Sequence, residues 1–497
     1  MLVKILVISF LLFAQINATN YYVDSEKGDN VNSGLTPEFA WKTLSKVMET
    51  SLQPGDSVLL KRGSKFPEEF ILSFSGTKDN PIVIGAYGKG EKPLIKGSIE
   101  AKKWRKHSNI VWRSKLKEEP ACIWLIDEDK TIHWGIKKES INALEKNYDF
   151  VWQDSVLYLF LGKNPSKTFP KVECSVRDYG IINNLDLKNI DYLIIENLEI
   201  SFVRDAAIRA IGSKGWIVKN CTLHHNGVTD ESDGQGIQYE GTDGLFSNNV
   251  LYENGQHGFF LSSFGNADVA YNIIEKNKIY NNYHTGIDLM NDGGDENSHS
   301  NTIIRQNLVY ETPNFKGVEV GIQTLGYENG LVKNVTIHHN IVVNISDIGI
   351  SAVSNSDSIF IHNNTVYETK NTCINIDNDT YYAEVYNNIG ISHIYWAPFF
   401  VENSKNKNVD YNIWNIGQQS FAYIDGEYAD AWNDYVKKYG FDKNGTDKQL
   451  NIHLENLIPV ITESDAFSID NGKNLKYNFD YFGKPIRGNL DIGAIEF

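Results

Sequence analysis

Short runs of alternating apolar and polar residues recur along the middle of the chain, and each run begins at an asparagine. Examples are Asn-Lys-Ile-Tyr at Asn277 and Asn-Leu-Val-Tyr at Asn307. Alternation with a period of two is typical of β-strands that bury one face. The asparagines recur at intervals of 23 to 33 residues: Asn197, Asn220, Asn249, Asn277, Asn307, Asn340, Asn364, Asn388 and Asn412. This period predicts a repeat architecture, a parallel β-solenoid with one repeat per coil.

A second set of positions supports the same repeat. Nine or more residues after the first six of these asparagines, a small residue precedes an apolar one: Ala207-Ile208, Gly236-Ile237, Gly258-Phe259, Gly286-Ile287, Gly321-Ile322 and Gly349-Ile350. Glycine suits a corner between two sheets because it lacks a Cβ atom. Coils stack about 4.8 Å apart, so equivalent asparagine amides can hydrogen-bond to one another inside the core. Frequent turn residues alone would not keep two sets in matched register.

The regions on either side of the repeats have different patterns of apolar residues. Helical spacing of Phe39, Trp41, Leu44 and Val47 predicts a helix over residues 37–48, which would cover the open end of the solenoid. Residues 100–180 break the repeat and contain Trp104, Trp112, Trp124, Trp134 and Trp152. We interpret this stretch as a small inserted β-module whose tryptophans form its core; a sugar-stacking surface is the alternative.

The chain therefore divides into five parts. These are a signal peptide (1–18), an N-terminal cap with the first coils (19–99), the inserted β-rich module (100–180), the coils that carry the site (181–417), and C-terminal coils with a cap (418–497). The signal follows from Lys4, the apolar stretch after it and a small residue, Ala18. We expect cleavage near Ala18 and secretion to the periplasm or the extracellular space.

Charge and cysteine content narrow the possible partners. Acidic residues outnumber basic ones, 63 to 47, and a net charge of −16 argues against binding to nucleic acid or to an anionic membrane. After the signal, no apolar stretch approaches the roughly 18 residues of a membrane span. Of four cysteines, Cys122 and Cys174 are a candidate disulfide pair, whereas Cys221 and Cys373 lie too far apart. We expect a monomer.

Three features together resemble a known superfamily. The opening residues 28–47, the asparagine-marked coils and the closing Asp-Ile-Gly-Ala-Ile-Glu at 491–496 are similar to the pectate-lyase-like superfamily of secreted proteins. The resemblance implies an all-β, right-handed parallel β-helix and a polysaccharide or oligosaccharide substrate. It does not imply one reaction, because the fold includes hydrolases, lyases and epimerases.

Ionisable residues concentrate on outward positions of about five adjacent coils. Asp288 and Glu319 are the predicted acid and base, and they lie on neighbouring coils with an offset of four positions. One rung of about 4.8 Å plus this offset favours the wider spacing of inverting hydrolases. His257, His284 and Asp233 complete the predicted catalytic group. The predicted substrate-binding residues are Arg204, Arg209, Gln238, Glu240, Gln323 and Tyr283.

The sequence leaves two possibilities for a metal ion. Asp292, Asp295 and Glu296 cluster in a glycine-containing loop and are candidate Ca²⁺ ligands; a solvated acidic loop is the alternative. Either no cofactor is required or the cofactor is Ca²⁺.

We expect a carbohydrate-active enzyme, first of all a glycoside hydrolase, because the acidic cluster contains no convincing lysine base. One alternative is a lyase or epimerase acting on a uronate-containing glycan, in which Arg204 or Arg209 is the nearest basic candidate. The match of Gly286-Ile287-Asp288 to alginate epimerases is incomplete, because Leu289-Met290 follows it. A non-catalytic glycan-binding solenoid is the third possibility.

Overall fold

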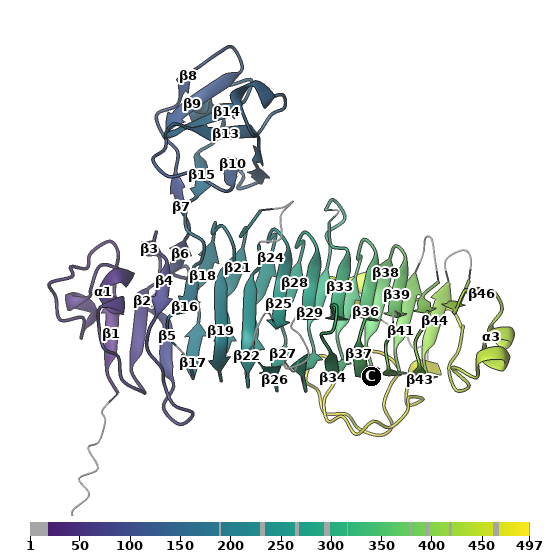
Figure 1. The fold of residues 1–497 in the computed structure, drawn as a ribbon. Helices are drawn as coiled ribbons and strands as arrows, with labels where there is room; N and C mark the ends of the chain where they lie inside the picture. The colour runs from purple at the N-terminus through teal and green to yellow at the C-terminus, as the bar shows by residue number, and fades with distance from the viewer. Residues whose placement is uncertain are drawn as a thin grey trace, which may run out of the picture.

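The computed structural model describes residues 18–187, 190–228, 234–263, 268–292, 299–315, 317–377, 379–392, 397–416, 420–460 and 467–496. Figure 1 shows an elongated stack of coils with a compact module standing on it toward the N-terminal end. The predicted all-β, right-handed parallel β-helix is confirmed. Residues 1–17 of the predicted signal peptide lie outside the described residues.

Each coil contributes strands to three faces, and the strands of successive coils pair in parallel. The first face contains β4 (Phe70–Leu72), β16 (Ile181–Asn183), β19 (Ile208–Lys214), β22 (Ile237–Thr242), β25 (His257–Ser263), β29 (Thr285–Asn291), β33 (Val320–Gly326), β36 (Ile348–Val353), β39 (Thr372–Ile376), β42 (Phe399–Val401) and β45 (Ala422–Ile424). The short strands β26 (Val269–Ala270) and β30 (His299–Ser300) continue it toward the second face.

The second face contains β1 (Asn20–Val23), β2 (Ser57–Lys61), β5 (Ile82–Tyr87), β17 (Leu193–Glu196), β20 (Ile217–Lys219), β23 (Leu245–Ser247), β27 (Ile273–Glu275), β31 (Ile303–Arg305), β34 (Val332–His338), β37 (Ser356–His362), β40 (Tyr382–Tyr386) and β43 (Asn406–Asp410). The third contains β3 (Lys65–Phe66), β6 (Leu94–Lys96), β18 (Glu199–Ser201), β21 (Thr222–His224), β24 (Val250–Tyr252), β28 (Lys278–Tyr280), β32 (Leu308–Tyr310), β35 (Ile341–Val343), β38 (Thr365–Thr369), β41 (Ile389–Ser392) and β44 (Ile413–Ile416). One continuous apolar core fills the space between the faces.

The asparagine ladder exists from Asn249 to Asn412. Each side-chain amide donates to the Oδ1 atom of the next asparagine, at 3.1 Å in the first step and 3.0 Å in the later ones. Asn412 then donates to the Oδ1 atom of buried Asp442 at 2.8 Å. The ladder therefore satisfies its polar groups inside the core and ends on a carboxylate.

The prediction that Asn197 and Asn220 are the first two members of the ladder is wrong. Asn220 is exposed and Asn197 is half-buried, with φ angles of 55° and 59°. The strand register instead places Leu198 and Cys221 at the positions equivalent to Asn249. Asparagine is favoured both in this left-handed conformation and in the ladder, so residue type alone does not separate two adjacent positions.

The glycine column is present for a different reason from the one predicted. A Cβ atom on Gly286 would lie 2.5 Å from the carbonyl oxygen of Gly321 and 2.5 Å from Cγ1 of Val309. The same clash would occur between Gly321 and the carbonyl oxygen of Gly349. Close stacking of coils, not a positive φ angle at a corner, therefore requires glycine here.

The N-terminal cap contains less helix than predicted. A 3-10 turn, η1 (Pro37–Phe39), and one helical turn, α1 (Leu44–Met48), replace the single helix. Trp41 between them is extended because it forms a β-bridge with Val23. Thr43 caps α1 by accepting the backbone N–H of Lys46, and the buried Leu44 and Val47 close the core.

Residues 98–175 form the module. Its two sheets contain β7 (Ser98–Glu100), β10 (Ile123–Ile126), β11 (Ile132–Trp134) and β15 (Lys171–Ser175), and β8 (Arg105–Lys106), β9 (Val111–Lys115), β12 (Ile136–Lys137), β13 (Asp149–Gln153) and β14 (Val156–Phe160). Two short helical turns, η2 (Ile141–Ala143) and α2 (Pro165–Thr168), complete it. Cys122 and Cys174 are both buried and are not joined to each other, so the candidate disulfide is absent.

The tryptophans of the module do not all belong to its core. Trp104 packs in the core of the module, with Trp112 and Trp152 at its edge. Trp124 and Trp134 instead pack with Phe202 of the solenoid. The interpretation as module core is therefore wrong for these two, because they join the module to the coils.

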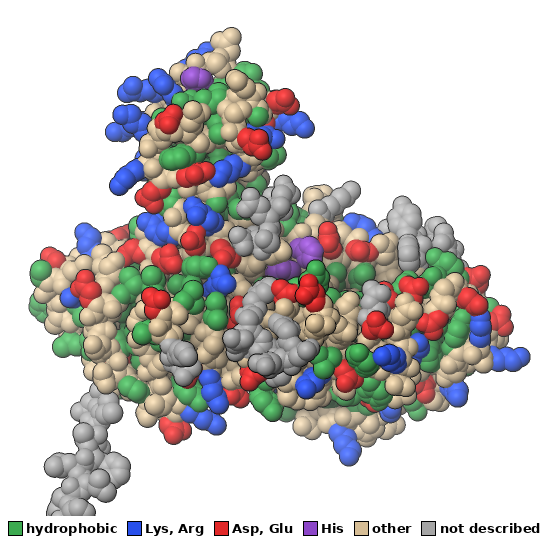
Figure 2. Space-filling model, in the orientation of Figure 1, with side chains coloured by type: hydrophobic (Ala, Val, Ile, Leu, Met, Phe, Trp, Pro, Cys, Tyr) green, Lys and Arg blue, Asp and Glu red, His purple; other side chains and the backbone are tan. Residues whose placement is uncertain are grey.

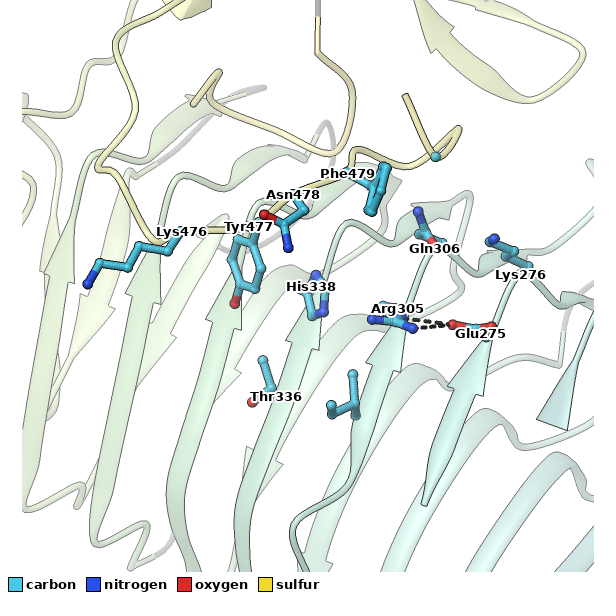
Figure 3. A pocket seen from close by; sticks show the side chains of 12 residues that line it. Glu275, Lys276, Arg305, Gln306, Thr336, His338, Lys476, Tyr477, Asn478 and Phe479 are labelled. Carbon is cyan, nitrogen blue, oxygen red and sulfur yellow. Dashed lines mark hydrogen bonds and ion pairs between the residues drawn. The ribbon is translucent and has the colours of Figure 1, made fainter. Parts of the chain in front are cut away.

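The C-terminal part folds back along the stack. It contains β46 (Glu427–Ala429), α3 (Trp432–Tyr439), β47 (His453–Glu455) and β48 (Ile458–Val460). Tyr477 stacks on His338 with ring centroids 4.3 Å apart. Figure 3 shows Tyr477 and Phe479 beside the strand ends that carry His338 and Arg305, and these residues line a cavity of about 630 Å³. In the described part of the chain, no helix is long and apolar enough to cross a membrane.

Candidate functional site

The candidate site lies on the outer side of the first face. Ile287 and Leu289 point into the core, so Asp288 between them in β29 points outward. Parallel pairing places five outward residues in one row across successive coils: Arg209, Gln238, Phe260, Asp288 and Gln323. The fold therefore brings together four predicted site residues from four separate coils.

Asp288 is buried, although the sequence predicted a solvent-facing position. Its side chain is 4% exposed, and its Oδ2 atom lies 3.8 Å from Nδ1 of His257. In the described part of the chain, its Oδ1 atom has no hydrogen-bond partner. Burial disfavours the charged carboxylate and raises the pKa of Asp288 to about 7. Asp288 can therefore hold a proton at neutral pH, as a general acid must.

His257 is buried beside this carboxyl group. Its ring stacks on Phe260 with centroids 4.6 Å apart. Burial, and then the nearby His284, lower the pKa of His257 well below its usual value. The imidazole is therefore neutral at neutral pH, and the proton of this pair lies on Asp288.

A second imidazole connects the buried pair to the surface. The rings of His257 and His284 meet edge to face with centroids 5.3 Å apart. His284 Nδ1 lies 2.8 Å from the hydroxyl of Thr285, and its Nε2 lies 3.3 Å from Oε2 of Glu319. The Glu319 side chain is 62% exposed. The two predicted carboxylates thus lie at opposite ends of a pair of histidines. Asp288 at one end is buried, and Glu319 at the other end is exposed to solvent.

Gln238 and Glu240 form a buried polar pair on the coil that carries β22. The amide of Gln238 donates to Oε1 of Glu240 at 3.2 Å and to the hydroxyl of Ser262 at 3.4 Å. Glu240 is 1% exposed. Both residues lie on the same face as Asp288, two coils nearer the N-terminus.

The two predicted arginines have protein partners. Arg209 donates to the hydroxyl of Tyr179 at 2.6 Å and to Asp205 at 3.2 Å. Arg204 pairs with Asp178 at 3.2 Å and donates to the carbonyl oxygen of Glu119 at 3.2 Å. Arg204 therefore ties the module to the coil, and its prediction as a substrate-binding residue is not supported by these contacts.

Tyr283 lies where the module meets the coils. Its ring packs edgewise against Phe315 at 4.9 Å and against Trp134 at 5.5 Å. Trp134 also stacks on His225 at 6.1 Å. Trp134 was missed as a site residue because the contact joins positions far apart in the sequence. Its only sequence signal was a tryptophan-rich insertion.

Part of the predicted site cannot be placed. Asp233, Asp295 and Glu296 lie outside the described residues, and Asp292, which directly follows β29, is half-buried. Among the described residues, no three His, Cys, Asp or Glu side chains are grouped as a metal site. Figure 2 shows histidine side chains beside Asp and Glu side chains on the visible face of the solenoid.

Comparisons with known proteins agree with this architecture. Residues 174–332 match the right-handed β-helix region family. The complex structure of XylC with xylose has a TM-score of 0.56 at 16% identity, covering 96% of this chain and 98% of that one. The chain is a right-handed β-helix protein. Pectate lyase Pel9A has a TM-score of 0.51 at 14% identity, covering 97% of each chain, which confirms the pectate-lyase-like resemblance at the level of the fold.

One curated relative is more similar over a short stretch. The β-helix protein is 40% identical over 95 residues to a lacto-N-biosidase from Bifidobacterium longum subsp. longum. The match covers 18% of this chain and spans only 6% of that relative's length.

Proposed function

We propose that the chain is a carbohydrate-active enzyme that hydrolyses a glycosidic bond, with Asp288 as general acid and Glu319 as general base. The observation that carries this proposal is the buried Asp288, whose pKa of about 7 differs from that of an ordinary aspartate. Carboxyl groups held in different environments are how glycosidases separate the acid role from the base role. The short match to a lacto-N-biosidase supports the same reaction class.

The reaction divides between the two ends of the histidine pair. Asp288 donates its proton to the glycosidic oxygen as the bond from the anomeric carbon to that oxygen breaks. Glu319 accepts a proton from a water molecule whose oxygen forms the new bond to the anomeric carbon. The proton on Glu319 then returns to solvent, and Asp288 is reprotonated from solvent. His257 and His284 lie between the two carboxyl groups, and His284 positions Glu319 at 3.3 Å.

A lyase is the second candidate, because His257 is neutral and buried in the same site. A neutral imidazole can remove the proton next to a uronate carboxyl group, after which the glycosidic bond breaks by elimination. This reaction needs a uronic acid at the site and produces an unsaturated sugar.

Product analysis separates the two reactions. Polysaccharides of plant, algal and animal origin are incubated with the chain, and new reducing ends and ultraviolet absorbance are both recorded. Reducing ends without absorbance support hydrolysis, and an equal rise of both supports the lyase. If neither reducing ends nor absorbance appear with any polysaccharide of the panel, both reactions are contradicted, and a non-catalytic glycan-binding solenoid is favoured.

A further inference from the structure

The module carries a concentrated positive charge on a chain that is acidic as a whole. A cavity of about 420 Å³ opens on its surface, lined by Lys102, Lys103, Arg105, Arg113 and Lys115. Glu100 is the single carboxylate among the lining residues, and it pairs with Lys102 at 3.0 Å. Figure 2 shows Lys and Arg side chains gathered along one edge of the module. The net charge of the whole chain, −16, makes this local excess of cations unusual.

Backbone pairing forces part of this charge together. Arg105 in β8 lies directly opposite Arg113 in β9. Like charges at directly opposite positions of antiparallel strands repel each other and destabilise the sheet. Neither arginine forms an ion pair with a carboxylate in the described part of the chain. Lys115 projects from the same side of β9 as Arg113. This repulsion is relieved if an anion binds between the strands.

The place of the cavity in the module fits a ligand that also reaches the candidate site. The cavity lies on the sheet of β8, β9 and β14, whereas β10 and β11 in the other sheet face the solenoid. On that second sheet, Trp134 contacts Tyr283, the neighbour of His284. The module therefore links the basic cavity to the wall of the candidate site. Figure 1 shows β8 and β9 at the end of the module away from the coils, so a ligand that contacts both places is a polymer and not a single sugar.

We propose that the basic cavity binds the carboxylate or sulfate groups of an acidic polysaccharide and holds this polymer for the β-helix. Guanidinium groups favour this role because they bind carboxylates and sulfates through paired hydrogen bonds. The choice of a polysaccharide rests on the proposed function. Nucleic acid is the competing polyanion, and the choice of a glycan over it rests on the carbohydrate chemistry proposed for Asp288 and Glu319.

Binding to the full-length Asp288→Asn protein tests this proposal without turnover. The probes are an oligogalacturonate, its methyl ester, a sulfated glycan and a DNA duplex. We expect an acidic glycan to bind, with an affinity that falls as salt rises, and the methyl ester to bind at least about tenfold more weakly than its parent acid if the parent binds. Binding of neither acidic glycan, or tighter binding of DNA, overturns the proposal.

Substitutions locate the binding. Arg105→Gln with Arg113→Gln should weaken acidic-glycan binding by about tenfold or more, since each pair of charge-assisted bonds is lost. The matched control is Lys163→Gln with Lys167→Gln, which removes two exposed charges from the same module outside the cavity. Equal loss in both double variants overturns the location. The cavity variant should also unfold at a higher temperature than the parent when no ligand is present, and a lower unfolding temperature overturns the repulsion argument.

Measurements of KM and kcat distinguish failure of this proposal from failure of the proposed function. With Asp288 intact, the cavity variant should show a raised KM for the acidic polymer and an unchanged kcat. An unchanged KM overturns the cavity proposal alone. If the parent chain binds acidic glycans but shows no activity toward any glycan, the proposed function alone is overturned.

Discussion

Replacement of Asp288 by asparagine tests both its burial and its role. Asparagine keeps the size of the side chain and removes the ionisation. In the folded chain the pKa of Asp288 is about 7, against an ordinary value of 3.8. Each pKa unit corresponds to about 1.36 kcal/mol, so ionising Asp288 in the folded state costs about 4 kcal/mol more than in the unfolded chain.

The sign of the effect follows from proton binding. Below pH 3.8 the Asp288 carboxyl group is protonated in both states, so it adds no pH dependence to the free energy of unfolding. Between pH 3.8 and about 7 the folded chain keeps the proton that the unfolded chain has lost, so the free energy of unfolding falls as pH rises. Above about pH 7 this loss is complete. Asp288→Asn carries no such loss, so the variant should gain up to about 4 kcal/mol over the parent at pH 8 and little at pH 4.

Urea unfolding at pH 4 and pH 8, followed by tryptophan fluorescence and by circular dichroism, measures this difference. Coincident transitions from the two probes justify a two-state treatment. Turnover of the variant should fall by about 10²-fold or more, because the proton donor is gone. Equal stability of variant and parent at pH 8 would refute the burial argument. Undiminished turnover would refute the catalytic role and direct attention to Glu240 and His257.

Four further predictions address the ladder, the glycine column and the acid–base pair. Asn277→Leu removes the oxygen that accepts both the side-chain amide and the backbone N–H of Asn249. The free energy of unfolding should fall by about 1 to 3 kcal/mol per lost partner, and an unchanged melting temperature would argue against the ladder. Gly286→Ala places a Cβ atom 2.5 Å from the Gly321 carbonyl oxygen, so we expect a lower melting temperature, and a neutral result would show that the coils can separate. If Asp288 is the acid, kcat/KM should fall as pH rises through about 7. Glu319→Gln should cost turnover non-additively with Asp288→Asn, and simple additivity would mean that the two residues do not act in one transition state.

Much of the scaffold follows from local pattern. A period of two within each run and the recurrence of Asn and Gly determine parallel coils, and the register then places Asp288, Gln238 and Gln323 in one row. The pattern distinguishes residues that face the core from residues that face outward. It does not distinguish Asn220 from the ladder, because the left-handed conformation selects the same residue type one position away.

The candidate site depends on contacts that no local pattern contains. Alternation places Asp288 on the outer side of the sheet, but His257 and Phe260 from another coil decide that it is buried and carries a raised pKa. The contact of Trp134 with Tyr283 depends on how the inserted module packs against the coils. The sequence by itself therefore determined the solenoid, because its strands repeat a short-range pattern. Tertiary structure alone decided the environment of Asp288, because burial and charge at an outward position depend on residues distant in the chain.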